Sequence, residues 1–90
     1  MSNQLSAVLT DGLHSSFLEE LRALTDAPGE TPISTRQASL MTGIAESTFE
    51  QWRSTRRVGI PFYKYGRSVR YKIVDIRNFI DRSRVDNAAA

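Results

Sequence analysis

The segment from Ile33 to Arg82 most constrains the fold of this chain. Within its 50 residues the spacing of apolar residues changes several times between that of a helix and that of a strand. The order predicts a helix, a sharp turn, a second helix, a basic β-hairpin and a closing helix. A chain of 90 residues buries only a modest core, so we expect one small module with at most an appendage. The prediction is therefore a mainly α fold with a small β-hairpin, formed by residues 33–84.

The first helix of the module is predicted to begin at Ser34, because Ser34 and Gln37 have the spacing of a capping box. Ala38 and Met41 are three residues apart, which places them on one face of this helix. Gly43 lies in the turn that follows. Glycine can adopt the positive φ that ends one helix and lets the next begin at a steep angle.

The second helix is predicted from about residue 46 to residue 54, with Phe49 and Trp52 facing the core. Its polar face and edges carry Ser47, Thr48, Glu50, Gln51 and Arg53. A helix followed by a basic hairpin is a shape that binds DNA, so we expect Ser47, Thr48 and Gln51 to meet base edges and Arg53 to meet phosphates. Gln can form two hydrogen bonds to adenine, and Glu can accept a hydrogen bond from cytosine. Two alternatives stay open: the face is an ordinary polar helix surface, or Glu50 pairs with a neighbouring arginine.

The hairpin is predicted to have strands at residues 62–65 and 68–72, with Gly66 and Arg67 in the turn between them. Arg67 at the tip is the best candidate for a minor groove, because a narrow A·T-rich groove concentrates negative potential. The other hairpin residues that we expect beside DNA are Lys64, Tyr65, Ser68, Arg70 and Lys72. Tyrosines on a hairpin serve packing as often as binding.

The closing helix is predicted from an apolar stripe of Ile73, Ile76, Phe79 and Ile80, and residues 85–90 are expected to be a disordered tail. Residues 1–32 form an acidic appendage, with an amphipathic helix followed by a linker at residues 26–32. The apolar residues of that helix that we expect to touch a second copy or another protein are Leu13, Phe17, Leu21 and Leu24. Docking of the same residues on the module itself is the alternative.

Charge divides the chain into two parts. Residues 1–33 carry one basic and five acidic residues, a net charge of −4, whereas residues 34–90 carry eleven basic and five acidic residues, a net charge of +6. The basic residues from position 53 to position 72, with no acid among them, are Arg53, Arg56, Arg57, Lys64, Arg67, Arg70 and Lys72. Such an excess attracts a polyanion, and we expect Arg36, Arg56 and Arg57 to contact phosphates. A merely solvated basic surface is the alternative.

The residues favour a binding module over an enzyme. The chain has no cysteine and a single histidine, His14, so we expect neither a metal site nor a cofactor. Glu19 and Glu20 are adjacent, so they diverge around a helix and cannot converge on one substrate. The sequence has no apolar run of membrane-spanning length and no signal-peptide pattern, so we expect a cytoplasmic protein.

In their order and spacing, several residues of this segment resemble a known family. They are Ala38, Gly43-Ile44, Ser47-Thr48-Phe49 with Trp52, Pro61, Gly66-Arg67, Val69-Arg70-Tyr71, and Asp75-Ile76 with Phe79. The segment is similar to the MerR-like winged helix-turn-helix of phage and mobile-element excisionases and AlpA-type regulators. The resemblance covers a little over half of the chain. It implies that the second helix enters the major groove and that the hairpin, as a wing, reaches the adjacent minor groove.

Three features depart from the family pattern. Ala45 stands where the family often has Ser or Thr as a helix cap, which loses a hydrogen bond worth about 1 kcal/mol. Leu40 occupies a position that is usually polar, so we expect an exposed leucine that contacts the N-terminal helix or a neighbouring subunit. Residues 1–32 have no counterpart in the minimal module.

The resemblance implies a function as well as a fold. Excisionases act as recombination directionality factors: they bind tandem sites on double-stranded DNA side by side, bend the DNA, and promote excision by an integrase. Other family members regulate promoters with the same fold, and both functions remain open for this sequence. A protein-contact adaptor, acting through residues 1–32, is the alternative from another class.

Overall fold

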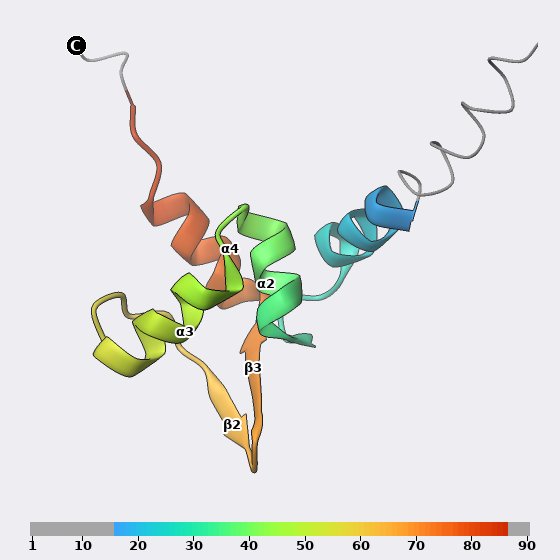
Figure 1. The fold of residues 1–90 in the computed structure, drawn as a ribbon. Coiled ribbons are helices and arrows are strands. Elements are labelled where there is room, and N and C mark those ends of the chain that lie inside the picture. The colour runs from blue at the N-terminus through green and yellow to red at the C-terminus, as the bar shows by residue number, and fades with distance from the viewer. Residues whose placement is uncertain (1–15, 87–90) are drawn as a thin grey trace, which may run out of the picture.

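The computed structural model describes residues 16–86, which form four helices and a small three-stranded antiparallel sheet (Figure 1). After a helix over residues 16–26, the elements are β1 (Pro32–Ile33), α2 (Thr35–Thr42), α3 (Glu46–Thr55), β2 (Tyr63–Tyr65), β3 (Ser68–Lys72) and α4 (Ile73–Arg82). The predicted fold class, mainly α with a small β component, is confirmed. Of the predicted tail, only residues 85 and 86 are described, and they lie beyond the end of α4.

The connection from α2 to α3 follows the sequence prediction closely. The Ser34 hydroxyl accepts a hydrogen bond from the Gln37 amide (3.1 Å), and the Gln37 side chain accepts one from the Ser34 amide (2.9 Å). Gly43 ends α2 with φ at 76° and donates its amide hydrogen to the Ser39 carbonyl (2.8 Å). Ala45 precedes α3 without a capping side-chain hydrogen bond. The reversal between the two helices therefore depends on the backbone freedom of one glycine.

The hairpin has the predicted turn but a shorter first strand. Tyr63 pairs with Arg70 and Tyr65 with Ser68, and Gly66 in the turn has φ at 61°. Phe62, predicted to begin the strand, precedes it and packs against the core, with its ring 6.3 Å from the Tyr71 ring. The ladder therefore begins one residue later than predicted.

Strand β1 was not predicted, because Pro32 and Ile33 belong to a segment that reads as linker and helix start. Pro32 pairs with Lys72 and Ile33 with Tyr71, so β3 lies between β1 and β2. The residues just before β1 also supply hydrogen-bond acceptors to the first turn of α4, where no side chain caps the helix. The amide of Ile73 donates to the Thr31 carbonyl (3.1 Å), and that of Val74 donates to the Gly29 carbonyl (2.9 Å). Backbone carbonyls thus satisfy amides that a helix start leaves unpaired.

The core lies between α2, α3, α4 and the inner face of β3. Its fully buried large side chains are Ile33, Phe49, Tyr71, Ile73 and Ile76. The ring of Phe49 makes edge contacts with Trp52 and Tyr71, each at 5.6 Å between centroids, and Trp52 continues to Phe79. The predicted stripe of α4 is correct at Ile73 and Ile76. It is wrong at Ile80, which lies in α4 but is 40% exposed.

The N-terminal helix is docked on the module by its C-terminal end. Leu24 is only 5% exposed and belongs to the core, so the expectation that it contacts a partner is wrong. The Arg77 guanidinium donates to the carbonyls of Leu24, Thr25 (2.6 Å) and Ala27 (3.2 Å). A cation at the C-terminal end of a helix satisfies free carbonyls and complements the helix dipole. This end of the appendage is therefore part of the folded unit.

The other predicted contact residues divide into three groups. Leu40 is half-buried and packs against the core, which corrects the expectation of an exposed leucine. Leu21 is half-buried, whereas Phe17 is 45% and Leu18 42% exposed. Leu13 lies outside the described residues. The exposed apolar surface of the helix is thus its N-terminal part, away from Leu24.

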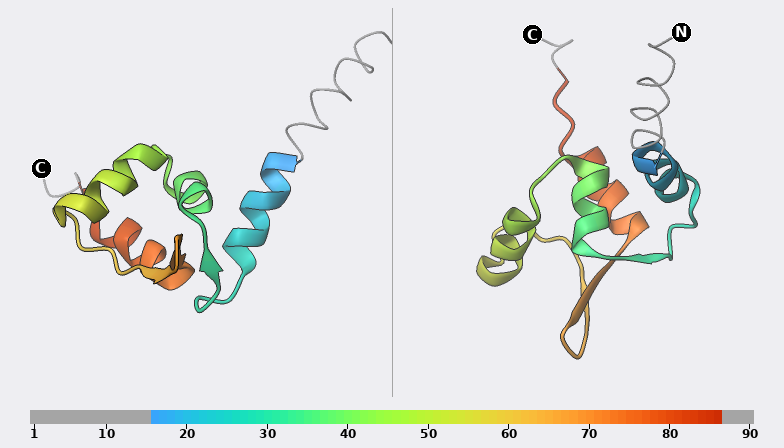
Figure 2. Two further views of the ribbon diagram at one scale, coloured as in Figure 1. Left: turned by 60° about the horizontal axis from the view of Figure 1, so that its bottom comes forward. Right: turned by 45° about the vertical axis from the view of Figure 1, so that its right-hand side comes forward.

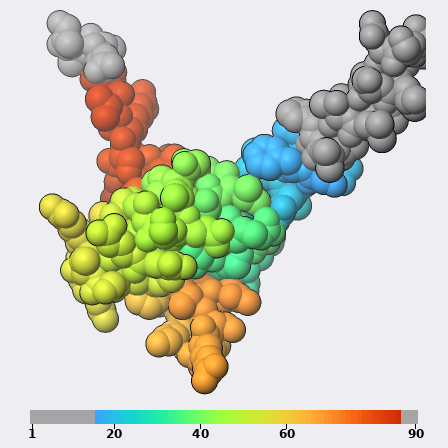
Figure 3. Space-filling view, in the orientation of Figure 1, coloured from blue at the N-terminus to red at the C-terminus, as the bar shows by residue number. Residues whose placement is uncertain are grey.

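In space, α3 and the hairpin project from one side of the α2–α4 core, and the N-terminal helix lies on the side away from α3 (Figures 1 and 2). In the space-filling view the hairpin forms a narrow protrusion below the body (Figure 3). The molecule therefore presents the end of α3 and the hairpin without cover from the N-terminal helix.

The contribution of Leu24 to the docking of the N-terminal helix can be tested by mutation. Leu24→Ala should lower the free energy of unfolding by about 3 kcal/mol, because it leaves a cavity in the core. Phe17→Ala, on the exposed part of the same helix, should change it by less than about 0.5 kcal/mol. Urea unfolding followed by the fluorescence of Trp52 measures both. Equal effects would mean that the helix does not depend on Leu24 for docking.

Candidate nucleic-acid interface

The outer face of α3 carries the polar residues predicted for base contact. Ser47, Glu50 and Gln51 are exposed and Thr48 is half-buried, whereas Phe49 on the opposite face is fully buried. The face is therefore polar, accessible and held by a helix whose inner side is anchored in the core. Its hydroxyl and amide groups can exchange hydrogen bonds with base edges.

Four of the predicted basic residues are available for an external partner. They are Arg56 and Arg57 after α3, and Lys64 and Arg67 on the hairpin, all of them exposed. Within residues 16–86, no hydrogen bond or ion pair engages these four side chains. The sequence places no acid between positions 53 and 72, so their positive charge is not neutralised locally. An uncompensated charge of this kind attracts a polyanion such as a phosphate backbone.

Arg56 has a second distinguishing property. It ends α3 in the left-handed conformation, with φ at 58° and its amide donating to the Trp52 carbonyl (2.8 Å). It is the only non-glycine residue with positive φ among the described residues. This conformation costs a side-chain-bearing residue roughly 1–2 kcal/mol. The helix is thereby ended by arginine at a position that glycine would fill with less strain.

Arg53 is engaged within the protein, contrary to its prediction as a DNA-contacting residue of this helix. Its guanidinium donates to the Tyr71 hydroxyl (2.7 Å) and to the Thr35 hydroxyl (3.2 Å). It also lies over the rings of Phe62 and Tyr71, 5.9 and 5.8 Å from their centroids. Because α3 turns this residue toward the sheet, Arg53 links α3 to α2 and β3.

Two other predicted DNA contacts are paired with acids of the N-terminal segment. Arg36 forms an ion pair with Glu20, and Lys72 forms one with Glu30 (2.7 Å). The hydrogen bond to Glu20 raises the pKa of Arg36, and the hydrogen bond to Glu30, with Tyr63 adding to it, raises the pKa of Lys72. Both cations are therefore partly neutralised within the protein, and their predicted contact with DNA stays a prediction.

The remaining hairpin residues differ in their availability. Arg70 is half-buried and folds back to donate to the Val69 carbonyl (2.8 Å), so its guanidinium is partly committed. Ser68 is exposed, and Tyr65 is 62% exposed. The Tyr65 ring stacks on that of Tyr63 with 6.5 Å between centroids and an interplanar angle of 9°. The tyrosines thus pack on each other on the outer face of the hairpin and leave the core to Tyr71.

Metal binding and membrane spanning can also be assessed for the part of the chain that the structure describes. Between residues 16 and 86, no three His, Cys, Asp or Glu side chains gather where they could hold a metal ion. The helices in that range are too short or too polar to cross a membrane. The candidate site offered by the described residues is the basic and polar surface of α3 and the hairpin.

Comparison with protein-family models, with curated proteins and with solved structures finds no match for this chain. The functional argument consequently depends on the residues and their geometry.

Sequence reasoning missed the residues that decide which cations are free. The pairs Glu20–Arg36 and Glu30–Lys72 join positions 16 and 42 residues apart, and no local pattern announces such pairing. The position of Tyr71 had a signal in the sequence, since strand alternation puts it on the same face as Val69 and opposite Arg70 and Lys72. The hydrogen bond from Arg53 to the Tyr71 hydroxyl follows only from the packing of α3 on β3.

The conformation of Arg56 predicts an effect on stability. Arg56→Gly should raise the free energy of unfolding by about 1 kcal/mol, because glycine adopts a positive φ without steric cost. Arg57→Gly removes the same charge from the neighbouring residue, which does not have positive φ, and should not stabilise the protein. Chemical denaturation of the two variants provides the comparison. Stabilisation by both would indicate relief of charge repulsion instead of backbone strain.

Proposed function

We propose that α2, α3 and the hairpin form a winged helix-turn-helix that binds double-stranded DNA. Helix α3 would enter the major groove as the recognition helix, and the hairpin would reach the adjacent minor groove as the wing. The observation that carries this proposal is the set of four unpaired cations, Arg56, Arg57, Lys64 and Arg67, beside the exposed polar face of α3. A polar helix face between phosphate-binding side chains has the composition expected of a DNA interface.

The dimensions of the interface support this geometry. The ten residues of α3 span about 15 Å, and a helix fits the major groove, which is about 12 Å wide. Ser47, Thr48 and Gln51 would read base edges, with Glu50 beside them. Arg56 and Arg57 would hold phosphates at the end of the helix.

The biological role proposed is that of an excisionase-like recombination directionality factor. Several copies would bind tandem sites, bend the DNA and promote excision of a mobile element by an integrase. Phe17 and Leu18, exposed on the N-terminal helix, supply apolar surface for contact between neighbouring copies or with the integrase. The same DNA-binding surface would serve a promoter regulator, which is the alternative role.

Gel-shift titration with footprinting tests the proposal. The probe is the DNA around the gene and any neighbouring attachment site, compared with random DNA at one salt concentration. A ladder of complexes with protected repeats about 10.5 bp apart, or a multiple of this spacing, supports side-by-side assembly. A single protected operator over a promoter supports the regulator instead. Equal, salt-sensitive binding to both DNAs would contradict sequence-specific recognition.

Arg67 provides a prediction for the wing. Arg67→Ala should weaken binding and flatten the dependence of log K on log salt by about one unit, because one phosphate-region contact is lost. Arg84→Ala removes the same charge from the segment after α4, which lies at the opposite end from the hairpin tip, and should leave the slope unchanged (Figure 1). Equal slopes for the wild type and Arg67→Ala would remove the wing from the interface.

Gln51 provides a prediction for the recognition helix. Gln51→Ala should cost about 1–3 kcal/mol of binding free energy on the specific site and almost nothing on random DNA, because a base contact is lost. Competition gel shifts with the two DNAs measure the difference. The same loss on both would mean that Gln51 reads no base.

A further inference from the structure

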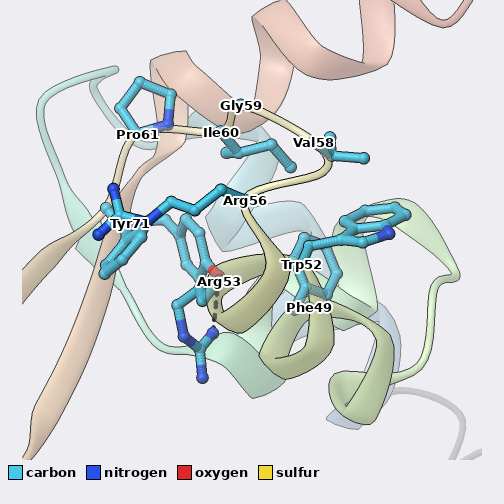
Figure 4. A pocket seen from close by; sticks show the side chains of 10 residues that line it. Phe49, Trp52, Arg53, Arg56, Val58, Gly59, Ile60, Pro61 and Tyr71 are labelled. Carbon is cyan, nitrogen blue, oxygen red and sulfur yellow. Dashed lines mark hydrogen bonds between the residues drawn. The ribbon is translucent and has the colours of Figure 1, made fainter.

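A hollow of about 520 Å³ opens between the C-terminal end of α3, the loop to β2, and β3 (Figure 4). It lies behind the polar face of α3, and the aromatic side chains that line it are Phe49, Trp52, Phe62 and Tyr71. Val58 and Ile60, from the loop, complete the apolar lining. Its volume is within the range of small-molecule sites in proteins, about 300–1,000 Å³.

The aromatic lining is a rigid surface. Phe49 and Tyr71 are fully buried, and their edge-to-face contact fixes the base of the hollow. Trp52 is half-buried, and its ring is held between those of Phe49 and Phe79, each 5.6 Å away. The side chains are therefore positioned by the core, and they do not need to reorganise to receive a flat apolar group.

The polar groups of the hollow are cationic. Arg53 is fixed by its hydrogen bond to the Tyr71 hydroxyl (2.7 Å). Arg56 extends across the hollow toward Pro61, and no hydrogen bond or ion pair to another described residue holds its guanidinium (Figure 4). The lining contains no Asp or Glu. An occupant that carries a negative charge would therefore meet a free arginine beside an aromatic surface.

We propose that this hollow binds a small organic anion with an aromatic body, of the arylalkanoate type. The ring would pack against Trp52 and Phe62, and the carboxylate would receive hydrogen bonds from Arg56. A cation would be repelled by two arginines, and a purely apolar group would leave Arg56 unpaired. The site is argued from its own residues and holds whether or not the protein binds DNA.

The test is a titration of the full chain with 4-phenylbutyrate. Trp52 is the only tryptophan, so its fluorescence reports directly on the hollow. We expect a saturable change with a dissociation constant on the order of 1 mM, which suits a ligand of this size. The neutral 4-phenylbutyramide has nearly the same shape and should bind at least about tenfold more weakly, since it lacks the charge that Arg56 pairs with.

Variants at one position separate charge from folding. Arg56→Gly removes the guanidinium while suiting the positive φ, and it should weaken phenylbutyrate binding to the level of the amide. Arg56→Lys keeps the charge and should retain most of the affinity. Arg67→Ala changes the net charge equally but lies at the hairpin tip, so it should bind as the wild type does.

Thermal unfolding of each variant checks that it is folded before titration. Equal binding of the acid and the amide would overturn the proposal and indicate only an apolar patch. An equal loss in Arg56→Gly and Arg67→Ala would overturn it in favour of a diffuse charge effect. Absence of any saturable change at concentrations tenfold above the expected dissociation constant would also overturn it.

Discussion

The burial of Tyr71 is the constraint on which the rest of the structure depends. This residue is 1% exposed at the centre of the sheet, where it pairs with Ile33 of β1. Its ring contacts those of Phe49 and Phe62, and its hydroxyl accepts a hydrogen bond from Arg53. One side chain thereby fixes α3, the root of the hairpin and β1 relative to one another. A buried hydroxyl needs such a partner, and the partner is supplied by the helix with the proposed DNA-reading face.

The N-terminal segment contributes structure as well as charge. Gly29 and Thr31 satisfy the first amides of α4, and Arg77 of α4 satisfies the carbonyls at the end of the N-terminal helix. Glu20 and Glu30 neutralise Arg36 and Lys72, on the side of the module nearest to that segment. Among the basic residues from position 53 to position 72, those without a partner consequently lie at the end of α3 and on the hairpin. Such a distribution orients a polyanion toward one side of the molecule.

Arg56 connects the two proposals. Under the two proposals, its exposed guanidinium would meet a phosphate in front of α3 or a carboxylate in the hollow behind it. A side chain that serves both would make the two ligands compete, so an organic anion would lower the affinity for DNA without entering the groove. Arg56 ends α3 in the left-handed conformation, and its side chain lines this hollow.

The sequence by itself determined the local elements, because their causes lie within a few residues. The capping box at Ser34, the positive φ of Gly43 and the turn at Gly66 all follow from spacing and from the backbone freedom of glycine. The sequence also determined which residues could form a basic surface. Only the tertiary structure decided which of them are free: Arg53 is held by Tyr71, whereas Arg36 and Lys72 are held by acids distant in the chain. It likewise created β1 and placed Leu24 in the core, because pairing and burial between distant segments depend on how the helices and strands pack together.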